Sequence, residues 1–486
     1  MRFLLINCLI FGFSLSLLAQ NKPNTNIKSP EMGGYAIPVT LLPFKNTKIY
    51  LGSYFGKSMT LVDSAQLNEK SQGVFKGSKK LTGGIYFLVS PNYTLISELL
   101  MDEKQQFSIT GDTLYREKIQ ITGSQDNTLF KQYSLFSIEK GKLRQDLDEQ
   151  YKMAKTPPDS ARIKKSILQL DSTVDQFRNN IIQKYPKSLL TMLFNAMKRP
   201  TAPSVPVIAG KPDSLYPYRY VKDHFWDEIL FNDDRLLRTP FFESKLDEYF
   251  KYYVSPEPDS IISEVKQMLL TARTGKEIYP YLLTKFTNKY INPEYMGQDN
   301  VFVYLFENFY AKGDTNLLNP ASRKTITDRA YSLMANQLGQ PAPVLNLTDS
   351  SGKISPLYQL KAYYTLVAFW DPTCGHCKTE IPQLDSMYRA KWKAMGVAVY
   401  SVNVNEKELT AWKAFINEKK ISRDWVQVYQ TKEVRSAEEK AGIANFRQLY
   451  DVFKTPTLYL LDKDKRIIAK QLTLQQFDAI MEAKRK

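Results

Sequence analysis

Cys374 and Cys377, separated by two residues, are the side chains of this sequence best placed to do chemistry. The apolar run from Leu366 to Trp370 predicts a buried strand, which the turn signal Asp371-Pro372 ends. Cys374 then opens a predicted helix, whose unpaired N–H groups and positive dipole stabilise a thiolate and lower the pKa of the thiol. Cys377 lies one turn later on the same face, within disulfide reach. The two residues therefore form a dithiol that can exchange two electrons.

A Cys-x-x-Cys pair also occurs as half of a structural zinc site or as a purely structural disulfide. A structural zinc ion needs four ligands, and outside this motif the chain offers only Cys8 and His224 as further Cys or His. A structural disulfide is seldom placed at a helix N-terminus beside a histidine. The strand, turn and helix context favours redox chemistry, and we expect neither a metal ion nor a cofactor.

Further residues in about the last third of the chain complete a pattern around the cysteines. They are Phe369-Trp370, Cys374-Gly-His-Cys-Lys378, Pro382, Thr455-Pro-Thr457, Gly339-Gln-Pro-Ala-Pro343, Leu345-Asn-Leu-Thr-Asp349 and Gly352. Together they resemble the thioredoxin fold, and more narrowly the TlpA/ResA branch of extracytoplasmic thiol-disulfide oxidoreductases. The combination is far more specific than Cys-x-x-Cys alone.

The resemblance implies separate roles for the two thiols. Cys374 attacks a partner's disulfide, and Cys377 resolves the mixed disulfide that results. His376, between them, can carry positive charge or donate a hydrogen bond to the Cys374 thiolate, which would favour an oxidant or isomerase. The alternative for His376 is an exposed histidine without effect on the thiols.

The resemblance assigns further residues to tuning or substrate binding. Pro456 matches the proline that is cis and faces the dithiol, and Thr455 before it would present backbone to an extended partner peptide. Glu380 matches a glutamate that could exchange the Cys377 proton, although an exposed helix carboxylate is the alternative. Trp370, which ends the strand before the motif, belongs to the same group.

Two departures from the family pattern leave the direction of electron flow open. The buried aspartate that many thioredoxins carry on the strand before the motif is replaced by Ala368, and the tryptophan usual before the first cysteine by Thr373. Neither change affects the dithiol chemistry itself.

The 486 residues exceed what one compact core usually holds, so roughly two to four domains are expected. Short runs separated by Gly, Asn and Pro over residues 31–125 predict an all-β domain of antiparallel strands, sandwich-like or a small barrel. Apolar residues at helical spacing predict an α-helical domain over residues 126–336. Strands alternating with helices and ending in a hairpin predict an α/β sheet over residues 337–486, the thioredoxin-like domain of the resemblance.

Two smaller predictions concern the first two domains. The segments Gly83-Gly-Ile-Tyr-Phe-Leu-Val89 and Gln106-Phe-Ser-Ile-Thr-Gly-Asp112 resemble a β domain of unknown function found ahead of such thioredoxin modules. The prolines between Arg199 and Pro217 predict an exposed loop, with a helix following over about Lys222 to Phe231.

The net charge of +16 comes from lysines scattered among carboxylates. A nucleic-acid-binding protein would concentrate its basic residues in a stripe with interleaved aromatics. The sequence has no such stripe, so nucleic-acid binding is not expected.

Residues 1–19 have the layout of a secretory signal peptide, cleaved after Ala19, and an uncleaved anchor is the alternative. Cys8, in the middle of the apolar run, counts as an apolar residue of that signal. No later segment is long and apolar enough to span a bilayer, so the mature chain is expected in the periplasm or cell envelope.

These observations predict an exported thiol-disulfide oxidoreductase that reduces, oxidises or isomerises disulfides of envelope proteins. Its partners would be protein thiols and disulfides, with a membrane electron donor as a further partner if it acts as a reductase. One alternative is an envelope binding or scaffold protein with an auxiliary thioredoxin module. The other is a thiol peroxidase.

Overall fold

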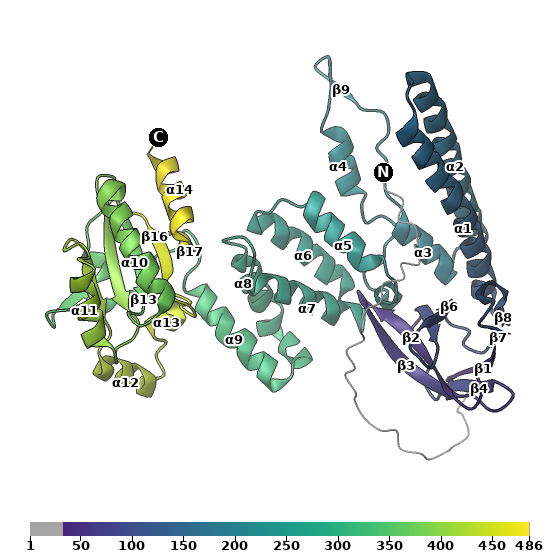
Figure 1. Ribbon diagram of the computed structural model, residues 1–486, viewed down its shortest axis with the longest axis horizontal. Coiled ribbons are helices and arrows are strands. Elements are labelled where there is room, and N and C mark those ends of the chain that lie inside the picture. Colours follow the sequence, from purple (N-terminus) through teal and green to yellow (C-terminus); the bar gives the residue numbers. More distant parts are fainter. Residues whose placement is uncertain (1–32, 486) are drawn as a thin grey trace. The chain divides into compact units, whose positions relative to one another are not determined.

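The computed structural model describes residues 33–485, so the predicted signal peptide at 1–19 and Cys8 lie outside the described residues. The chain forms two compact units (Figure 1). The first holds the described residues up to Val254 together with Leu270–Tyr279, and the second holds Ser255–Leu269 together with the chain from Pro280 onward. The predicted domain boundaries at 125/126 and 336/337 follow sequence pattern and stay predictions. The predicted succession of fold classes is confirmed: β sheets, then helices, then a mixed α/β sheet.

Two four-stranded sheets, ordered β4-β1-β7-β8 and β3-β2-β5-β6, begin the first unit. Along β1, buried residues such as Ile37 and Val39 alternate with exposed ones, as expected when one face of a strand covers a core. Both sheets contribute to the same apolar cluster, which makes a sandwich. One pairing, β1 with β7, is parallel, whereas the sequence pattern predicted antiparallel strands. The strands are β1 (Tyr35–Leu42), β2 (Lys48–Phe55), β3 (Ser58–Gln66), β4 (Gln72–Gly77), β5 (Gly84–Val89), β6 (Leu95–Met101), β7 (Ser108–Asp112) and β8 (Gln120–Thr122).

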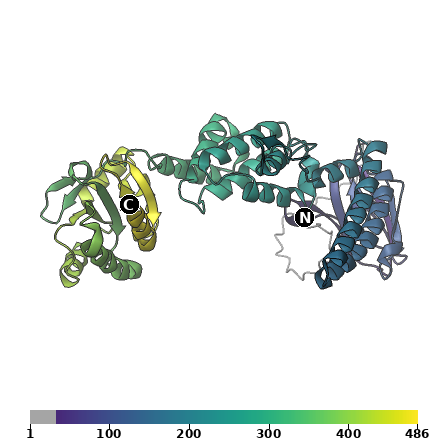
Figure 2. The same ribbon diagram turned by 90° about the horizontal axis from the view of Figure 1, so that it is seen from above.

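Helices α1 (Gln125–Met153) and α2 (Pro157–Lys184) follow the sandwich and run side by side (Figures 1 and 2). The side chain of Asn127 in α1 ties this pair to β6, because it accepts from the Leu100 N–H and donates to the Leu100 carbonyl, both at 2.8 Å. A second apolar cluster joins the strands to α1, α2 and α3 (Leu189–Met197). The helices that complete this unit are α4 (Tyr216–Asp223) and α5 (Phe242–Tyr252), and the short 3₁₀ helix η2 (Asp234–Arg238) lies between them.

The loop predicted between Arg199 and Pro217 is mostly exposed and carries a two-residue ladder of β9 (Val207–Ile208) with β10 (Lys211–Pro212). The helix predicted over Lys222 to Phe231 is wrong in position, because α4 ends at Asp223. Pro217 occupies the first turn of α4, where a missing N–H costs nothing.

The second unit combines helices with the C-terminal sheet. Its helical part contains α8 (Asp299–Asn308) and α9 (Pro320–Met334), with α6 (Pro258–Ala272) and α7 (Ile278–Tyr290) each shared between the two units. The sheet has the order β12-β11-β15-β14-β13-β16-β17. Its strands are β11 (Asn346–Asp349), β12 (Ile354–Pro356), β13 (Tyr364–Trp370), β14 (Val397–Asn403), β15 (Val426–Tyr429), β16 (Thr457–Leu461) and β17 (Ile467–Leu472).

The central strand β13 is buried on both faces, and it pairs in parallel with β14 and antiparallel with β16. Leu366, Ala368 and Trp370 join one apolar cluster, while Val367 and Phe369 join the other, the period of two expected of a strand. The first cluster includes residues of α10 (Gly375–Met387), α11 (Leu409–Glu418) and α14 (Leu474–Lys484), and the second includes Phe446 of α13 (Phe446–Leu449). This layering fixes the end of β13, where the dithiol follows.

Two ion pairs within this unit lie between α8 or α9 and the C-terminal sheet region. Lys470 of β17 donates to Asp299 of α8 at 2.5 Å and to the Asn336 side chain at 2.7 Å, and both ions are at most 5% exposed. Arg329 of α9 pairs with Asp451, whose side chain is fully buried. Buried charges need such partners, so removing one residue of either pair would leave a buried charge without its counterion.

Candidate dithiol site

The turn between β13 and α10 is built by Asp371. One carboxylate oxygen accepts from the Thr373 N–H at 2.7 Å and from the Thr373 hydroxyl at 2.6 Å, and the other accepts from Asn405 Nδ2 at 3.0 Å. The Cys374 N–H also donates to the Asp371 carbonyl at 3.1 Å. An aspartate that bonds to the backbone two residues on makes the chain reverse at that point. The turn therefore sets where Cys374 stands.

Cys374 is the N-cap residue of α10, as the sequence predicted for a helix opening at this cysteine. Its thiol is half-buried and donates to the Thr455 carbonyl at 3.5 Å. Cys377, one turn into the helix, is fully buried. Both are free thiols in the structure, the reduced form of the predicted pair, and their disulfide stays a prediction.

The two thiols have opposite pKa shifts. Partial burial works against ionisation of Cys374, but hydrogen bonds with the Thr455 side chain and with the Cys377 and His376 backbone outweigh it and lower the pKa of Cys374. Burial raises the pKa of Cys377 to about 12, against a smaller lowering effect from the Asp371 backbone. A thiolate forms at Cys374 first, and the thiolate is the attacking species in disulfide exchange.

The other predicted residues lie around this pair in different ways. His376 is exposed, and the hydrogen bond it supplies to Cys374 comes from its backbone. Glu380 is half-buried on α10, in the turn after Cys377. Trp370 is fully buried and donates from Nε1 to the Ser401 hydroxyl at 2.7 Å, a position that supports the strand and cannot touch a partner.

The Thr455–Pro456 peptide bond is cis, as the resemblance predicted for Pro456. Thr455 and Pro456 are both half-buried, and the Thr455 carbonyl faces the Cys374 thiol. The structure thus brings together two segments that lie 81 residues apart in the sequence.

Sequence reasoning did not identify Asn405, which fixes the Asp371 turn. A usable signal existed, because Asn405 directly follows the apolar run from Val397 to Val404. That run contains β14, which is parallel to β13, and the carboxyl ends of parallel strands meet at one edge of a sheet.

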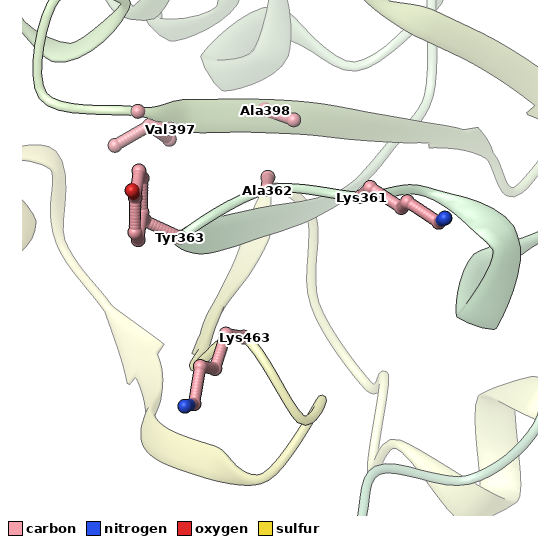
Figure 3. A pocket seen from close by; sticks show the side chains of 7 residues that line it. Lys361, Ala362, Tyr363, Val397, Ala398 and Lys463 are labelled. Carbon is pink, nitrogen blue, oxygen red and sulfur yellow. The ribbon is translucent and has the colours of Figure 1, made fainter.

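A surface hollow of about 530 Å³ lies at the other end of β13 and β14, lined among others by Lys361, Tyr363, Val397 and Lys463 (Figure 3). Tyr363 directly precedes β13, whereas the dithiol follows that strand, so this hollow has no part in the thiol chemistry.

The described residues offer neither a metal-binding cluster nor a membrane-spanning helix. Between residues 33 and 485, no group of three or more His, Cys, Asp or Glu side chains could hold a metal ion. Over the same range, no helix has the length and apolar character needed to cross a membrane.

Two family models match this chain, one over the C-terminal sheet and one over the helices before it. Residues 338–470 match the AhpC/TSA family, and residues 165–329 match a domain of unknown function, DUF5106. A domain of unknown function thus precedes the thioredoxin-like one, and its match covers helices, whereas the predicted resemblance concerned the β segments.

Individual relatives are similar in the same region. The thiol-disulfide oxidoreductase ResA of Bacillus cereus is 28% identical over 134 residues, which cover 28% of this chain and 69% of that protein. A domain of a possible thiol-disulfide isomerase from Cytophaga hutchinsonii is 37% identical, with 30% of this chain and 92% of that one covered and a TM-score of 0.27. A thioredoxin-like protein from Bacteroides caccae is 24% identical, with 59% and 99% covered and a TM-score of 0.45.

Proposed function

Residues 338–470 of this chain belong to the AhpC/TSA family of thioredoxin-like oxidoreductases, and on that premise we propose that its thiol-disulfide exchange runs through Cys374 and Cys377. The observation that carries this proposal is the contrast between the two thiols. Cys374 is partly exposed and has a lowered pKa, whereas Cys377 is buried and has a raised pKa. The first is suited to attack an incoming disulfide and the second to remain protonated until attack is complete.

In the reducing direction, the Cys374 thiolate attacks one sulfur of a partner disulfide. A bond forms between Cys374 Sγ and that sulfur, the partner's S–S bond breaks, and the other partner sulfur leaves as a thiolate. Cys377 then loses its proton and attacks Cys374 Sγ, which releases the second partner sulfur. The partner gains two electrons and two protons, and the protein is left with a Cys374–Cys377 disulfide. Oxidation of a partner dithiol is the reverse sequence.

Several groups around the two cysteines support these steps. The Thr455 side chain and the backbone N–H groups at the start of α10 stabilise the Cys374 thiolate. In this proposal Glu380, in the turn of α10 after Cys377, takes the Cys377 proton, and the exposed His376 imidazole tunes Cys374. The Thr455 carbonyl faces Cys374, and an extended partner segment can pair with the backbone there.

The partners we propose are proteins with disulfides or dithiols in the cell envelope. The ResA relatives are named thiol-disulfide oxidoreductases, and the layout of residues 1–19 supports export to the periplasm or envelope. If the chain acts as a reductase, its disulfide must be reduced again by a donor, which for an exported protein would be a membrane protein.

The test is the reduction potential of the Cys374–Cys377 couple in the full mature chain, measured by equilibration in glutathione or dithiothreitol buffers and trapping of free thiols. A value near about −270 mV indicates a reductase, and a value of roughly −180 to −120 mV indicates an oxidant or isomerase. The Cys374→Ser, Cys377→Ser double variant is the control. The absence of a reversible two-electron couple overturns the proposal, and direct turnover of hydrogen peroxide would favour a peroxidase instead.

A further inference from the structure

The segment just before the cis proline exposes one large aromatic side chain. Phe453 is 77% exposed. It lies two residues before Thr455, whose carbonyl accepts the hydrogen bond of the Cys374 thiol. Because successive Cα atoms are about 3.8 Å apart, the Phe453 Cα lies within roughly 8 Å of the Thr455 Cα.

Two charged residues, Asp451 and Arg329, lie next to this exposed ring. Asp451, two residues earlier, is 2% exposed and pairs with Arg329, and its second carboxylate oxygen accepts from Gln471 Nε2 at 2.8 Å. The Arg329 guanidinium also lies over the Phe453 ring, 5.1 Å from its centroid. A guanidinium over an aromatic face is an attractive contact, so the ring has a preferred position before any partner arrives.

Arg329 comes from α9, at the last residue of the DUF5106 match and in the same compact unit as the sheet. Its Nη2 also donates to Asn292 Oδ1 at 3.1 Å, so the guanidinium itself is restrained. The helices before the thioredoxin-like domain therefore supply a guanidinium that contacts an exposed aromatic side chain two residues before Thr455.

We propose that Phe453, oriented by Arg329, selects partner proteins that carry an apolar side chain near the cysteine to be attacked. The inference rests on the proposed thiol-disulfide exchange. An extended partner segment advances about 3.3–3.6 Å per residue, so a side chain two or three residues from the attacked cysteine reaches the ring. An exposed aromatic that is already ordered loses little side-chain entropy on binding, which is the property of a contact residue.

The test uses the full chain and two disulfide-linked peptides that differ only in having Leu or Ser two residues from the attacked cysteine. We expect the wild-type protein to have the higher kcat/KM for the Leu peptide. Phe453→Ala should lower kcat/KM for that peptide by about tenfold and leave the Ser peptide nearly unchanged, as expected when a well-placed contact is truncated.

Tyr363→Ala is the matched control, because Tyr363 is 75% exposed but lies at the opposite end of β13 (Figure 3). It should change neither peptide. Arg329→Lys keeps a cation near Asp451 but loses the planar contact with the ring, so it should remove part of the preference for Leu.

The reduction potential of each variant is measured first. If the wild-type protein has no reversible couple, the proposed function fails. If the couple is intact, the inference is overturned by any of three results: no wild-type preference for Leu, an equal loss on both peptides in Phe453→Ala, or no effect of Arg329→Lys.

Discussion

Selective alkylation of Cys374 over Cys377 is the most direct consequence of the two pKa shifts. At pH 8, a thiol with a pKa of about 12 is ionised to about one part in 10⁴, and this is the expectation for Cys377. Cys374, with its pKa below 9.0, is ionised to more than about one part in eleven. The thiolate fractions thus differ by about a thousandfold.

Two other effects modify that ratio. A thiolate of higher pKa is intrinsically the better nucleophile, with a Brønsted slope of about 0.4–0.5. Over about three pKa units, this makes a Cys377 thiolate roughly 15- to 30-fold more reactive than a Cys374 thiolate. Its complete burial acts the other way, because the reagent cannot reach it in the folded chain. We therefore expect Cys374 to react with iodoacetamide at least about thirtyfold faster.

The assay is mass spectrometry of the reduced full chain, quenched at successive times and digested to separate labelling at the two positions. Cys377→Ser should react as fast as the wild-type protein, and Cys374→Ser should react slowly until the chain is unfolded. Similar rates at the two cysteines of the folded wild-type protein would refute the assignment of Cys374 as the attacking thiol. Raising the pH from 6 to 9 should accelerate the Cys374 reaction until its pKa is passed.

Three further predictions concern stability. Burial lowers the pKa of Lys245 to about 7, so the unfolded chain binds the Lys245 proton more tightly than the folded chain does. From pH 7 to about 10, the free energy of unfolding of the wild-type protein, measured by urea denaturation, should rise by up to about 1.4 kcal/mol per pH unit relative to Lys245→Met. A difference that stays constant with pH would contradict this. Lys470→Met should destabilise the chain by about 3 kcal/mol or more in thermal unfolding, because buried Asp299 loses its cation, and adding Asp299→Asn should recover part of the loss. Asn127→Leu should cost about 2 kcal/mol and reduce hydrogen-exchange protection of the Leu100 amide, whereas unchanged protection would mean that the two 2.8 Å bonds contribute little.

The dithiol could be predicted from the sequence because its signals are local. The apolar run of β13, the turn at Asp371-Pro372 and a cysteine at a helix start all fall within a dozen residues, and burial on both sheet faces explains why that run is continuous. The facing segment around Pro456 could be predicted only through a family resemblance, since no local pattern says which proline will meet a thiol 81 residues away.

Other features could not be predicted, because they depend on contacts between residues that the periodicity of the sequence does not indicate. The Arg329 guanidinium lies over the Phe453 ring, and nothing in the spacing of either residue indicates that they meet. The parallel pairing of β1 with β7 likewise depends on how the sandwich closes and not on the alternation within each strand. The error at α4 has a different cause, because prolines predict a loop up to Pro217, whereas Pro217 lies in the first turn of a helix.

The two buried ion pairs between the helices and the C-terminal sheet region also limit where recombination can divide this chain. A crossover near residue 337 would separate Lys470 from Asp299 and Asp451 from Arg329. Each half would then carry buried charges without partners, at a cost of several kcal/mol. We expect these four positions to change together in descendants of this chain, and recombination to succeed upstream of α8 more often than at the apparent domain boundary.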